Sequence, residues 1–202
     1  MELLFATTNP AKVKSYAEKL KQYDIKLKSI KDLNFKLDID ENGKNSIENA
    51  EIKAKAYYDA TKITTLGMDV SLIIEELPEE EQIGTHIRRI NGKYLTDEEA
   101  ITYYTKPAKQ YGGKLSAKWV YGVVIYNGKE VKKYSYSKEN FYFIDKASKK
   151  RNPGYPLDSI SIIPKFNKYL IELTEEEKRL NQKEQNTEVF DFIVNSLKVL
   201  NK

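Results

Sequence analysis

One short segment near the N-terminus carries side chains suited to binding phosphate. Residues 7–12 (Thr-Thr-Asn-Pro-Ala-Lys) follow an apolar stretch, residues 2–7, that predicts a buried strand, and they open a helical pattern. Asn9 can cap that helix, with the proline at its first position. Backbone N–H groups at such a helix start attract anions, and Thr8 and Lys12 can add donors to the same anion. The alternative is a capped helix with a surface lysine. The segment is not a P-loop, because it lacks the glycines and the Lys-Ser/Thr pair of that motif.

Two carboxylates later in the chain are candidate ligands for a divalent cation. Glu48 falls in the first turn of a helix predicted over residues 46–61, where a carboxylate favours the positive end of the helix dipole. It could instead be the acid of a capping arrangement with Asn45 as the cap. Asp69 follows a strand predicted over residues 63–68, and ligands of α/β sheets bind beyond the carboxyl ends of strands. Asp69 is therefore a turn-forming residue or a site residue, and only the fold could bring it near Glu48 around magnesium.

Lys53 is a weaker candidate on the same predicted helix. It follows Glu48 by five residues, which places it about 140° away around the helix axis. The two side chains need not share one ligand face, and Lys53 could be an ordinary surface lysine.

Composition and charge exclude several classes of function. The 202 residues contain no cysteine, which removes disulfides, zinc–thiolate sites and cysteine nucleophiles and fits a reducing cytoplasm. We find no signal peptide and no apolar stretch near the roughly 20 residues of a membrane span, so we expect a soluble, cytoplasmic protein with no membrane partner. The net charge of +4 comes from interspersed lysines and acids, which argues against a nucleic-acid partner. A serine–histidine triad would have to use His86, the single histidine, yet no Gly-x-Ser-x-Gly elbow occurs.

The hydrophobic pattern predicts a mixed α/β fold. Strands and helices alternate in the first half, whereas the second half contains a hairpin around Asn127-Gly128. Capping boxes start two further helices, after Thr96 and after Thr174. The predicted strands cover residues 2–7, 25–30, 63–68, 115–126, 130–136 and 139–144, and the predicted helices cover residues 10–20, 46–61, 97–106 and parts of the C-terminal region. We expect a mixed central sheet flanked by helices, with two lobes and a cleft between them, in a single domain over residues 1–202.

Three blocks in the first half resemble the inosine triphosphatase family. The family opens with a strand and a Thr-x-Asn-x-x-Lys turn, which residues 7–12 match. Its Glu-Asn-Ala-x-x-Lys-Ala block matches residues 48–54, and this is the most specific part of the resemblance. Its Asp-Asp-Ser-Gly-Leu block is altered to Met-Asp-Val-Ser-Leu at residues 68–72. Asp69 retains the aspartate that the family uses at the metal and the water.

Later matches concern the phosphates and the base. The arginine that follows a Pro-Gly-x-Tyr stretch in the family corresponds to Arg89, or to Arg88 with a shift, and would contact phosphate. A Glu-Glu-Lys stretch of the family is matched at its lysine by Lys178. Pro-Gly-Tyr at residues 153–155 resembles a Phe-Gly-Tyr-Asp-Pro segment, with Asp158 matching the aspartate if two residues are inserted.

The end of the resemblance is where this chain departs most from the family. Gln182-Lys183-Glu184 stands where the family has Ser-His-Arg. Neither Lys183 nor Glu184 reproduces a bidentate arginine contact. The residues that would handle triphosphate and metal are thus retained, whereas those that would recognise the purine are altered.

The resemblance implies a nucleoside triphosphate pyrophosphatase, a hydrolase of nucleotide metabolism that acts on noncanonical purine nucleotides (ITP, XTP and their deoxy forms). Water would attack the α-phosphorus, and the products would be a monophosphate and pyrophosphate. Mg²⁺ would be held by Glu48 and Asp69, Asp69 would also orient or deprotonate the water, and Lys12 would offset phosphate charge. The implied substrate contacts are Thr8, Asn9, Lys53, Arg88, Arg89, Tyr155, Asp158, Lys178 and Lys183. Family members usually form homodimers, and the resemblance implies one here.

Three alternatives stay open at this point. One is a pyrophosphatase of the same fold for pyrimidine or other modified nucleotides. A second is a nucleotide-binding protein that has lost catalysis, which the altered block at residues 68–72 favours. The third is a nucleic-acid-binding module, motivated by a sequence pI of about 8.9 and 15 tyrosines.

Overall fold

Two compact units make up the part of the chain that the computed structural model describes, which is residues 1–33, 35, 37–90, 92–183 and 188–200. Unit 1 combines residues 1–70, 121–136 and 186–202, and unit 2 combines residues 71–120 and 137–185. The chain passes between the units four times, three of them inside long strands, so neither unit is one continuous segment.

The elements alternate as the hydrophobic pattern predicts. Unit 1 contains β1 (Glu2–Phe5), α1 (Pro10–Lys21), β2 (Lys26–Ser29), the 3-10 helix η1 (Ile30–Asp32), α2 (Ser46–Thr61) and α5 (Glu188–Leu200). The long strands that contribute to both units are β3 (Thr65–Ile74), β6 (Lys114–Tyr126) and β7 (Val131–Ile144). Unit 2 adds η2 (Glu79–Glu81), β4 (Arg89–Ile90), β5 (Lys93–Tyr94), α3 (Asp97–Gln110), η3 (Pro156–Ser159), β8 (Ser161–Ile163), β9 (Lys168–Tyr169), η4 (Leu170–Glu172) and α4 (Glu175–Lys183).

The sheet is mixed, as predicted. Within the described residues its strands follow the order β2-β1-β3-β6-β7-β8-β9, and β4 and β5 form a separate pair. β1 runs parallel to β2 and β3, whereas β8 is antiparallel to both β7 and β9. The parallel half belongs to unit 1 and carries the connections that place helices on both faces.

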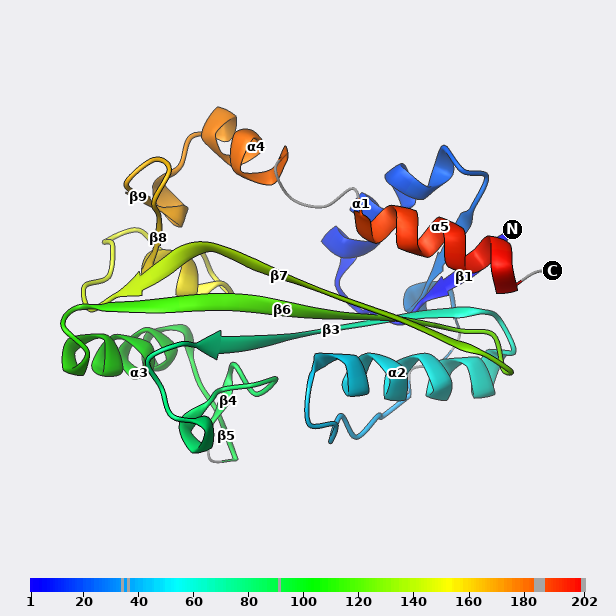
Figure 1. Cartoon of the computed structure of the whole chain (residues 1–202), viewed down its shortest axis with the longest axis horizontal. Coiled ribbons are helices and arrows are strands. Elements are labelled where there is room, and N and C mark those ends of the chain that lie inside the picture. The colour runs from blue at the N-terminus through cyan, green and yellow to red at the C-terminus, as the bar shows by residue number, and fades with distance from the viewer. Residues whose placement is uncertain (34, 36, 91, 184–187, 201–202) are drawn as a thin grey trace. The chain divides into compact units, whose positions relative to one another are not determined.

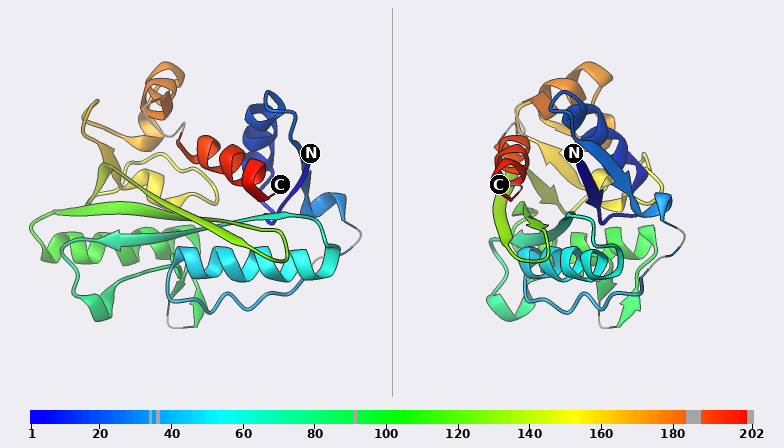
Figure 2. Two further views of the ribbon diagram at one scale, coloured as in Figure 1. Left: turned by 45° about the vertical axis from the view of Figure 1, so that its right-hand side comes forward. Right: turned by 90° about the vertical axis from the view of Figure 1, so that its right-hand side faces the viewer.

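Alternating side chains give each face of the sheet in unit 1 its own helices. Phe5 of β1 packs on Tyr16 of α1, which in turn contacts Phe190 of α5, with ring centroids 5.0 and 4.9 Å apart. Leu4 points to the opposite face and packs with Tyr57 of α2. Successive residues of a strand face opposite sides, so β1 serves both layers. Figures 1 and 2 show α2 along one face and α1 with α5 along the other.

Unit 2 has its own core around α3. Tyr104 is fully buried there and lies against Phe143 of β7, with ring centroids 5.9 Å apart. Its hydroxyl donates a 2.8 Å hydrogen bond to the carbonyl of Ile87, so the buried phenol is satisfied. Burial raises the pKa of Tyr104 well above the ordinary value for tyrosine. The hydrogen bond from Tyr104 therefore holds the loop before β4 against α3.

Several predicted elements are confirmed at or near their bounds. Helix α2 spans residues 46–61 as predicted, and Asn45 caps it by accepting a hydrogen bond from the backbone of Glu48. Both capping boxes form, at Thr96 before α3 and at Thr174 before α4. The final helix buries Phe190 and its apolar neighbours, as its pattern predicts.

Three predicted boundaries are wrong. The strand predicted over residues 63–68 runs on to Ile74 as β3, so Asp69 lies inside a strand and not beyond its end. The strands predicted over 130–136 and 139–144 are one strand, β7, because the unbroken neighbour β6 offers hydrogen bonds along its whole length. Helix α3 continues through Pro107 to Gln110, since burial of Ala108 in the core of unit 2 outweighs the hydrogen bond that the proline cannot donate.

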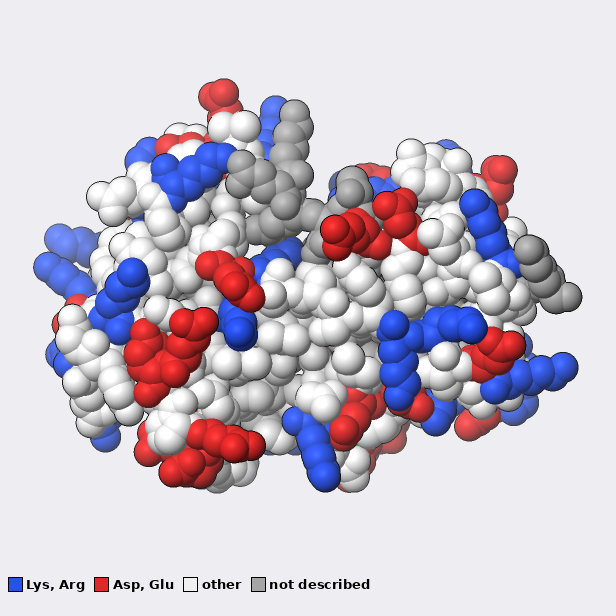
Figure 3. All heavy atoms as spheres, viewed as in Figure 1, with Lys and Arg blue, Asp and Glu red and all other residues white. Residues whose placement is uncertain are grey.

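Charged side chains of both signs are interspersed on the surface. On the face that Figure 3 shows, lysines and arginines alternate with aspartates and glutamates. No helix within the described ranges is long and apolar enough to cross a membrane. The surface pattern agrees with the interspersed charges of the sequence.

Helix α2 lies unusually close to the sheet, because two strand residues beneath it lack side chains. A Cβ atom on Gly67 of β3 would lie 2.0 Å from the carbonyl oxygen of Ala50, and one on Gly122 of β6 would lie 2.4 Å from the backbone of Ser46 and Ile47. Both contacts are with backbone atoms, which cannot rotate away. The two glycines therefore set the distance between α2 and the strands.

Replacing Gly67 with alanine should destabilise the protein by about 2–3 kcal/mol, because the helix must move off the strand. Gly112→Ala is the matched control. Its Cβ would meet open space, and only its left-handed backbone (φ +80°) resists the change, at a cost of about 1 kcal/mol. Urea unfolding of both variants measures the two costs. Equal costs would contradict the close packing of α2.

Candidate functional site

The turn after β1 forms the helix start that the sequence predicts. β1 ends beside β3, where Phe5 pairs with Leu66. Asn9 then caps α1, since its side-chain oxygen accepts a 3.2 Å hydrogen bond from the backbone N–H of Lys12. The backbone N–H of Asn9 donates at 3.2 Å to the hydroxyl of Thr7. The turn thus brings hydroxyl groups and a lysine to the carboxyl edge of the parallel strands.

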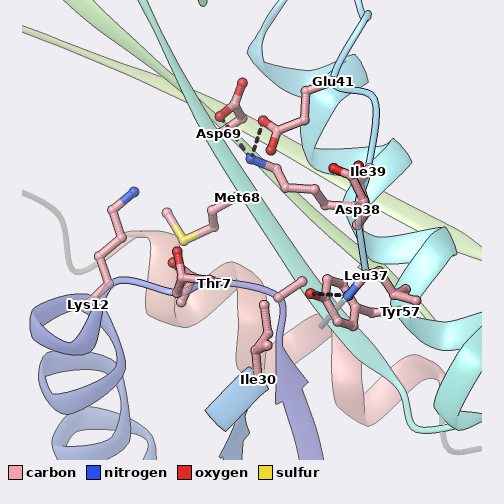
Figure 4. Close-up of a pocket in the computed structure, with 13 residues that line it drawn as sticks. Thr7, Lys12, Ile30, Leu37, Asp38, Ile39, Glu41, Tyr57, Met68 and Asp69 are labelled. Carbon is pink, nitrogen blue, oxygen red and sulfur yellow. Dashed lines mark hydrogen bonds and ion pairs between the residues drawn. The ribbon is translucent and has the colours of Figure 1, made fainter. Parts of the chain in front are cut away.

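A pocket of about 300 Å³ opens at this edge, within unit 1. Figure 4 shows it between the turn after β1, the strand β3 and the segment that precedes α2. Four predicted site residues line it: Thr8, Lys12, Lys53 and Asp69. The other lining residues are Ala6, Thr7, Ile30, Leu37, Asp38, Ile39, Glu41, Tyr57 and Met68.

Asp69 is held from two sides by side chains of α2. Its Oδ1 lies 2.9 Å from the ammonium of Lys53, and its Oδ2 accepts a 3.1 Å hydrogen bond from the side-chain amide of Asn49. Asn49 and Lys53 are four residues apart and therefore share one helix face. The side chains of Lys53 and Asp69 are only 13% and 16% exposed. The interpretation of Lys53 as an ordinary surface lysine is therefore wrong.

Asp69 lies inside β3, and not beyond its end as predicted, yet it still reaches an open edge of the sheet. The pairing of β1 with β3 stops at Leu66, three residues earlier. Asp69 consequently lies beyond the carboxyl end of β1, on the same edge as the turn that carries Thr8. The open edge at Asp69 is therefore the carboxyl end of the neighbouring strand β1, and not an end of β3.

Lys12 faces the same pocket from α1. It is half-buried, and burial lowers the pKa of its ammonium below the ordinary 10.5. The positive charge of Lys53 lowers that pKa further, whereas the Asp69 carboxylate raises it. Figure 4 shows the Lys12 side chain leaving α1 on the side of the pocket where Met68 lies. Two ammonium groups that repel each other across one pocket are an arrangement that an anion stabilises.

Glu48 forms the capping arrangement that the sequence analysis left open. Its carboxylate accepts hydrogen bonds from the backbone N–H of Lys44 at 2.8 Å and from the side-chain amide of Asn45 at 3.2 Å. It does not belong to the residues that line the pocket. The capping interpretation is confirmed, and a metal role for Glu48 stays a prediction.

Glu41 is a pocket carboxylate that sequence reasoning missed. Its Oε2 lies 3.0 Å from the Lys53 ammonium, so Lys53 bridges Glu41 and Asp69. Hydrogen bonds from the backbone of Gly43 to Asn49 and of Lys44 to Glu48 hold this segment to α2. The segment has no regular secondary structure and no local motif. Only the fold reveals Glu41, because its partner lies twelve residues further along the chain.

Arg88, one of the two candidate phosphate contacts in unit 2, has protein partners. Its guanidinium donates at 2.7 Å to Asp97 and at 2.8 Å to the carbonyl of Leu95. It also donates at 3.3 Å to the carbonyl of Gly154. The backbone N–H of Gly154 and then Arg88 lower the pKa of Asp97. Arg88 thus joins three segments of unit 2, whereas the neighbouring Arg89 is exposed.

The predicted base contacts of unit 2 lie around η3. Tyr155 is 54% exposed at the start of this helix. Asp158 accepts a 2.9 Å hydrogen bond from the side chain of Asn152. Burial raises the pKa of Asp158, and Asn152 and the charge of Lys178 oppose that effect. Lys178 itself pairs with Glu175 at 2.7 Å on α4.

Two predicted positions lack a described side chain. Lys183 is the last residue of α4, and its side chain falls outside the description. Glu184 lies entirely outside the described residues.

Comparison with known proteins decides the family. A model of the Ham1 family matches residues 3–185. The chain belongs to the Ham1 family. Relatives in this family include the dITP/XTP pyrophosphatase of Dictyoglomus thermophilum, 29% identical over 178 residues that cover 87% of this chain and 85% of that protein. The dITP/XTP pyrophosphatase of Wigglesworthia glossinidia brevipalpis is 30% identical over 181 residues, 88% of each chain.

Solved structures of Ham1 proteins share the fold. The Ham1 protein of Staphylococcus aureus has a TM-score of 0.75, with 22% identity and 98% of both chains covered. A HAM1 protein from Coxiella burnetii has a TM-score of 0.74, also with 22% identity and 98% of both chains covered. These matches confirm the resemblance drawn from the motifs and the mixed α/β fold.

Replacing Lys12 with methionine should raise the melting temperature at neutral pH by roughly 1–3 °C. The folded protein disfavours the charged ammonium, so it gains stability when that charge is removed. The sign follows from the lowered pKa of Lys12. Below that pKa the charged ammonium lowers the free energy of unfolding, and this loss of stability fades as pH rises toward the ordinary 10.5. The difference between variant and parent should therefore shrink above pH 10.

Lys14→Met is the control, because Lys14 is exposed on the same helix. Thermal unfolding followed by circular dichroism at pH 7 and pH 10.5 compares the three proteins. If Lys12→Met were less stable at pH 7 than Lys14→Met, burial of the charged Lys12 ammonium would not be destabilising, and the prediction would be wrong.

Proposed function

We propose that this Ham1-family chain hydrolyses noncanonical purine nucleoside triphosphates, such as ITP, XTP and their deoxy forms, to the monophosphate and pyrophosphate. The observation that carries the proposal is the pocket in unit 1, where Lys12 and Lys53 accompany the carboxylate of Asp69. Relatives that share over four-fifths of the chain are named dITP/XTP pyrophosphatases. Ammonium groups can offset the charge of phosphate oxygens, and a carboxylate can position the attacking water, so this combination suits hydrolysis of a polyphosphate.

The two lysines and the helix start would bind the phosphates. The N–H groups at the start of α1 favour anions, and the hydroxyl of Thr8 lines the same pocket. Phosphate oxygens would relieve the repulsion between Lys12 and Lys53, which supplies a favourable binding term. Asn9 fixes the turn through its cap, so its contribution to binding is mainly to hold the helix start.

Asp69 would orient the attacking water and accept its proton. The water oxygen forms a bond to the α-phosphorus as the bond to the leaving pyrophosphate oxygen breaks. Asn49 holds Oδ2 of Asp69 at 3.1 Å, which fixes the direction of the carboxylate. A carboxylate positioned by a second side chain is suited to this role.

Magnesium fits the oxygen donors of the pocket. Asp69 and Glu41 converge on one cationic group, the Lys53 ammonium. Magnesium is usually bound through one or two carboxylates, with waters and substrate phosphates as the other ligands. We therefore propose Asp69 and Glu41 as the carboxylates that would hold it, and Glu48 stays a prediction from the sequence. When bound, the ion supplies positive charge to the phosphate oxygens.

The side chains that the family resemblance gives as base contacts belong to unit 2. Tyr155 offers an exposed aromatic ring and Asp158 a carboxylate whose pKa is raised. Arg89, Lys178 and Lys183 stay predictions as phosphate or base contacts, and so do the homodimer and the cytoplasmic location. Arg88 already donates hydrogen bonds to Asp97 and to the carbonyl of Leu95, which favours a structural role for it.

Asp69→Asn should lower the rate of pyrophosphate release by a factor of about 100 or more, because the amide cannot accept the proton. The assay measures pyrophosphate from a panel of triphosphates with magnesium. Ser71→Ala, two residues along the same strand, is the control variant. Turnover of pyrimidine or adenine and guanine nucleotides alone would overturn the proposed substrate. Nucleotide binding without turnover would overturn the enzyme and favour a binding protein.

Glu41→Gln and Glu48→Gln form a matched pair of variants that tests which of the two carboxylates holds the metal ion. The pocket position of Glu41 predicts that Glu41→Gln raises the magnesium concentration needed for half-maximal rate by about tenfold or more. Glu48→Gln should mainly cost about 1 kcal/mol of stability, through the cap of α2. The reverse pattern would restore Glu48 as the metal ligand.

A further inference from the structure

The ammonium of Lys53 lies where two carboxylates meet. It is 2.9 Å from Asp69 and 3.0 Å from Glu41, and its side chain is 13% exposed. One ammonium between two carboxylates leaves the three groups with one unbalanced negative charge. Glu41 is the most exposed member, with 44% of its side chain accessible.

A divalent cation held by both carboxylates would lie close to the Lys53 ammonium, which contacts one oxygen of each. An ammonium and a metal ion that close repel each other, so each weakens the binding of the other. Lys53 can move, because its charge sits on a flexible four-carbon stem. Asn49 would keep Oδ2 of Asp69 in place after Lys53 leaves, since that hydrogen bond does not involve Lys53.

The ion pair with Glu41 is not needed to hold the preceding segment. The backbone N–H of Gly43 donates at 2.7 Å to Asn49, and that of Lys44 donates at 2.8 Å to Glu48. These bonds fix the segment to α2 without Lys53. Movement of the Lys53 ammonium would therefore not release the segment from α2.

We propose that Lys53 is an exchangeable counter-ion that couples metal binding to polyphosphate binding. Without substrate, its ammonium occupies Asp69 and Glu41 and weakens the binding of a free metal ion. A polyphosphate in the pocket attracts the ammonium to its own oxygens and opens the carboxylates. Lys12 faces the same pocket and is repelled by Lys53, and the oxygens of a polyphosphate would bind both ammonium groups. Metal and polyphosphate then each strengthen the binding of the other by the same factor. The inference rests on the proposed function, because it assumes that a polyphosphate enters this pocket.

The test measures binding of Mn²⁺, observed directly by its electron paramagnetic resonance signal, to the full chain. Lys53→Gln and Lys53→Met should bind Mn²⁺ at least tenfold more tightly than the parent. Lys55→Gln is the matched control on the same helix, because Lys55 pairs with Glu51, which does not line the pocket. Because removal of a positive charge beside two carboxylates favours a cation by itself, the coupling measured next distinguishes an exchangeable counter-ion from a structural lysine. Unchanged or weaker Mn²⁺ binding in both folded Lys53 variants overturns the proposal.

The coupling itself is measured on the unaltered protein. Saturating inorganic pyrophosphate, with correction for its own complex with Mn²⁺, should raise the affinity of the protein for Mn²⁺ at least tenfold. This factor should fall below about threefold in Lys53→Gln. Independent binding of the two ligands in the parent overturns the coupling. Tighter Mn²⁺ binding in Lys53→Gln, in a protein that hydrolyses no triphosphate, would overturn the proposed function and leave the counter-ion role standing.

Discussion

The close approach of α2 to β3 is the constraint on which the candidate site depends. Gly67 leaves room for the backbone of Ala50, so the helix lies against the strand without an intervening side chain. Asn49 and Lys53 on one face of that helix then reach Asp69, two residues beyond the glycine. A helix displaced by the width of a methyl group would lengthen both contacts. The packing of small groups in unit 1 thus sets the geometry of its charged groups.

Charge balance is the second consequence of that packing. Lys53 and Asp69 are both mostly buried, and neither would be stable there without the other. The pair is not an isolated salt bridge, because the Glu41 carboxylate and the Lys12 ammonium face the same pocket and interact with it. Groups that stabilise a fold alone are usually paired and closed off from solvent. Here the charges line a pocket, and a group in a pocket whose pKa is shifted by burial and by charged neighbours, as for Lys12, is a candidate for a functional site.

The sequence predicted the local parts of this arrangement and not the long-range ones. The cap at Asn9, the bounds of α2 and the capping boxes depend on residues three or four apart, and all of them are confirmed. The continuation of β3 through Asp69 depends on neighbouring strands, which no local pattern reveals. Glu41 was missed for the same reason, because an irregular segment carries no periodicity that links it to α2. The motif resemblance, which pairs distant blocks of the chain, correctly predicted the family and the mixed α/β fold.

The residues proposed for phosphate chemistry and for base recognition come from different units. Lys12, Lys53 and Asp69 belong to unit 1, whereas Tyr155 and Asp158 belong to unit 2. Each set is held by its own core and its own hydrogen bonds, so changes in one need not disturb the other. In unit 2, Arg88 and Asp97 both bind the backbone of Gly154, which fixes the segment that presents Tyr155. The proposed base contacts around η3 can therefore change without altering the side chains of the proposed phosphate pocket. The sequence agrees with such a division, because residues 7–12 and 48–54 match the family motifs whereas Gln182-Lys183-Glu184 stands where the family has Ser-His-Arg.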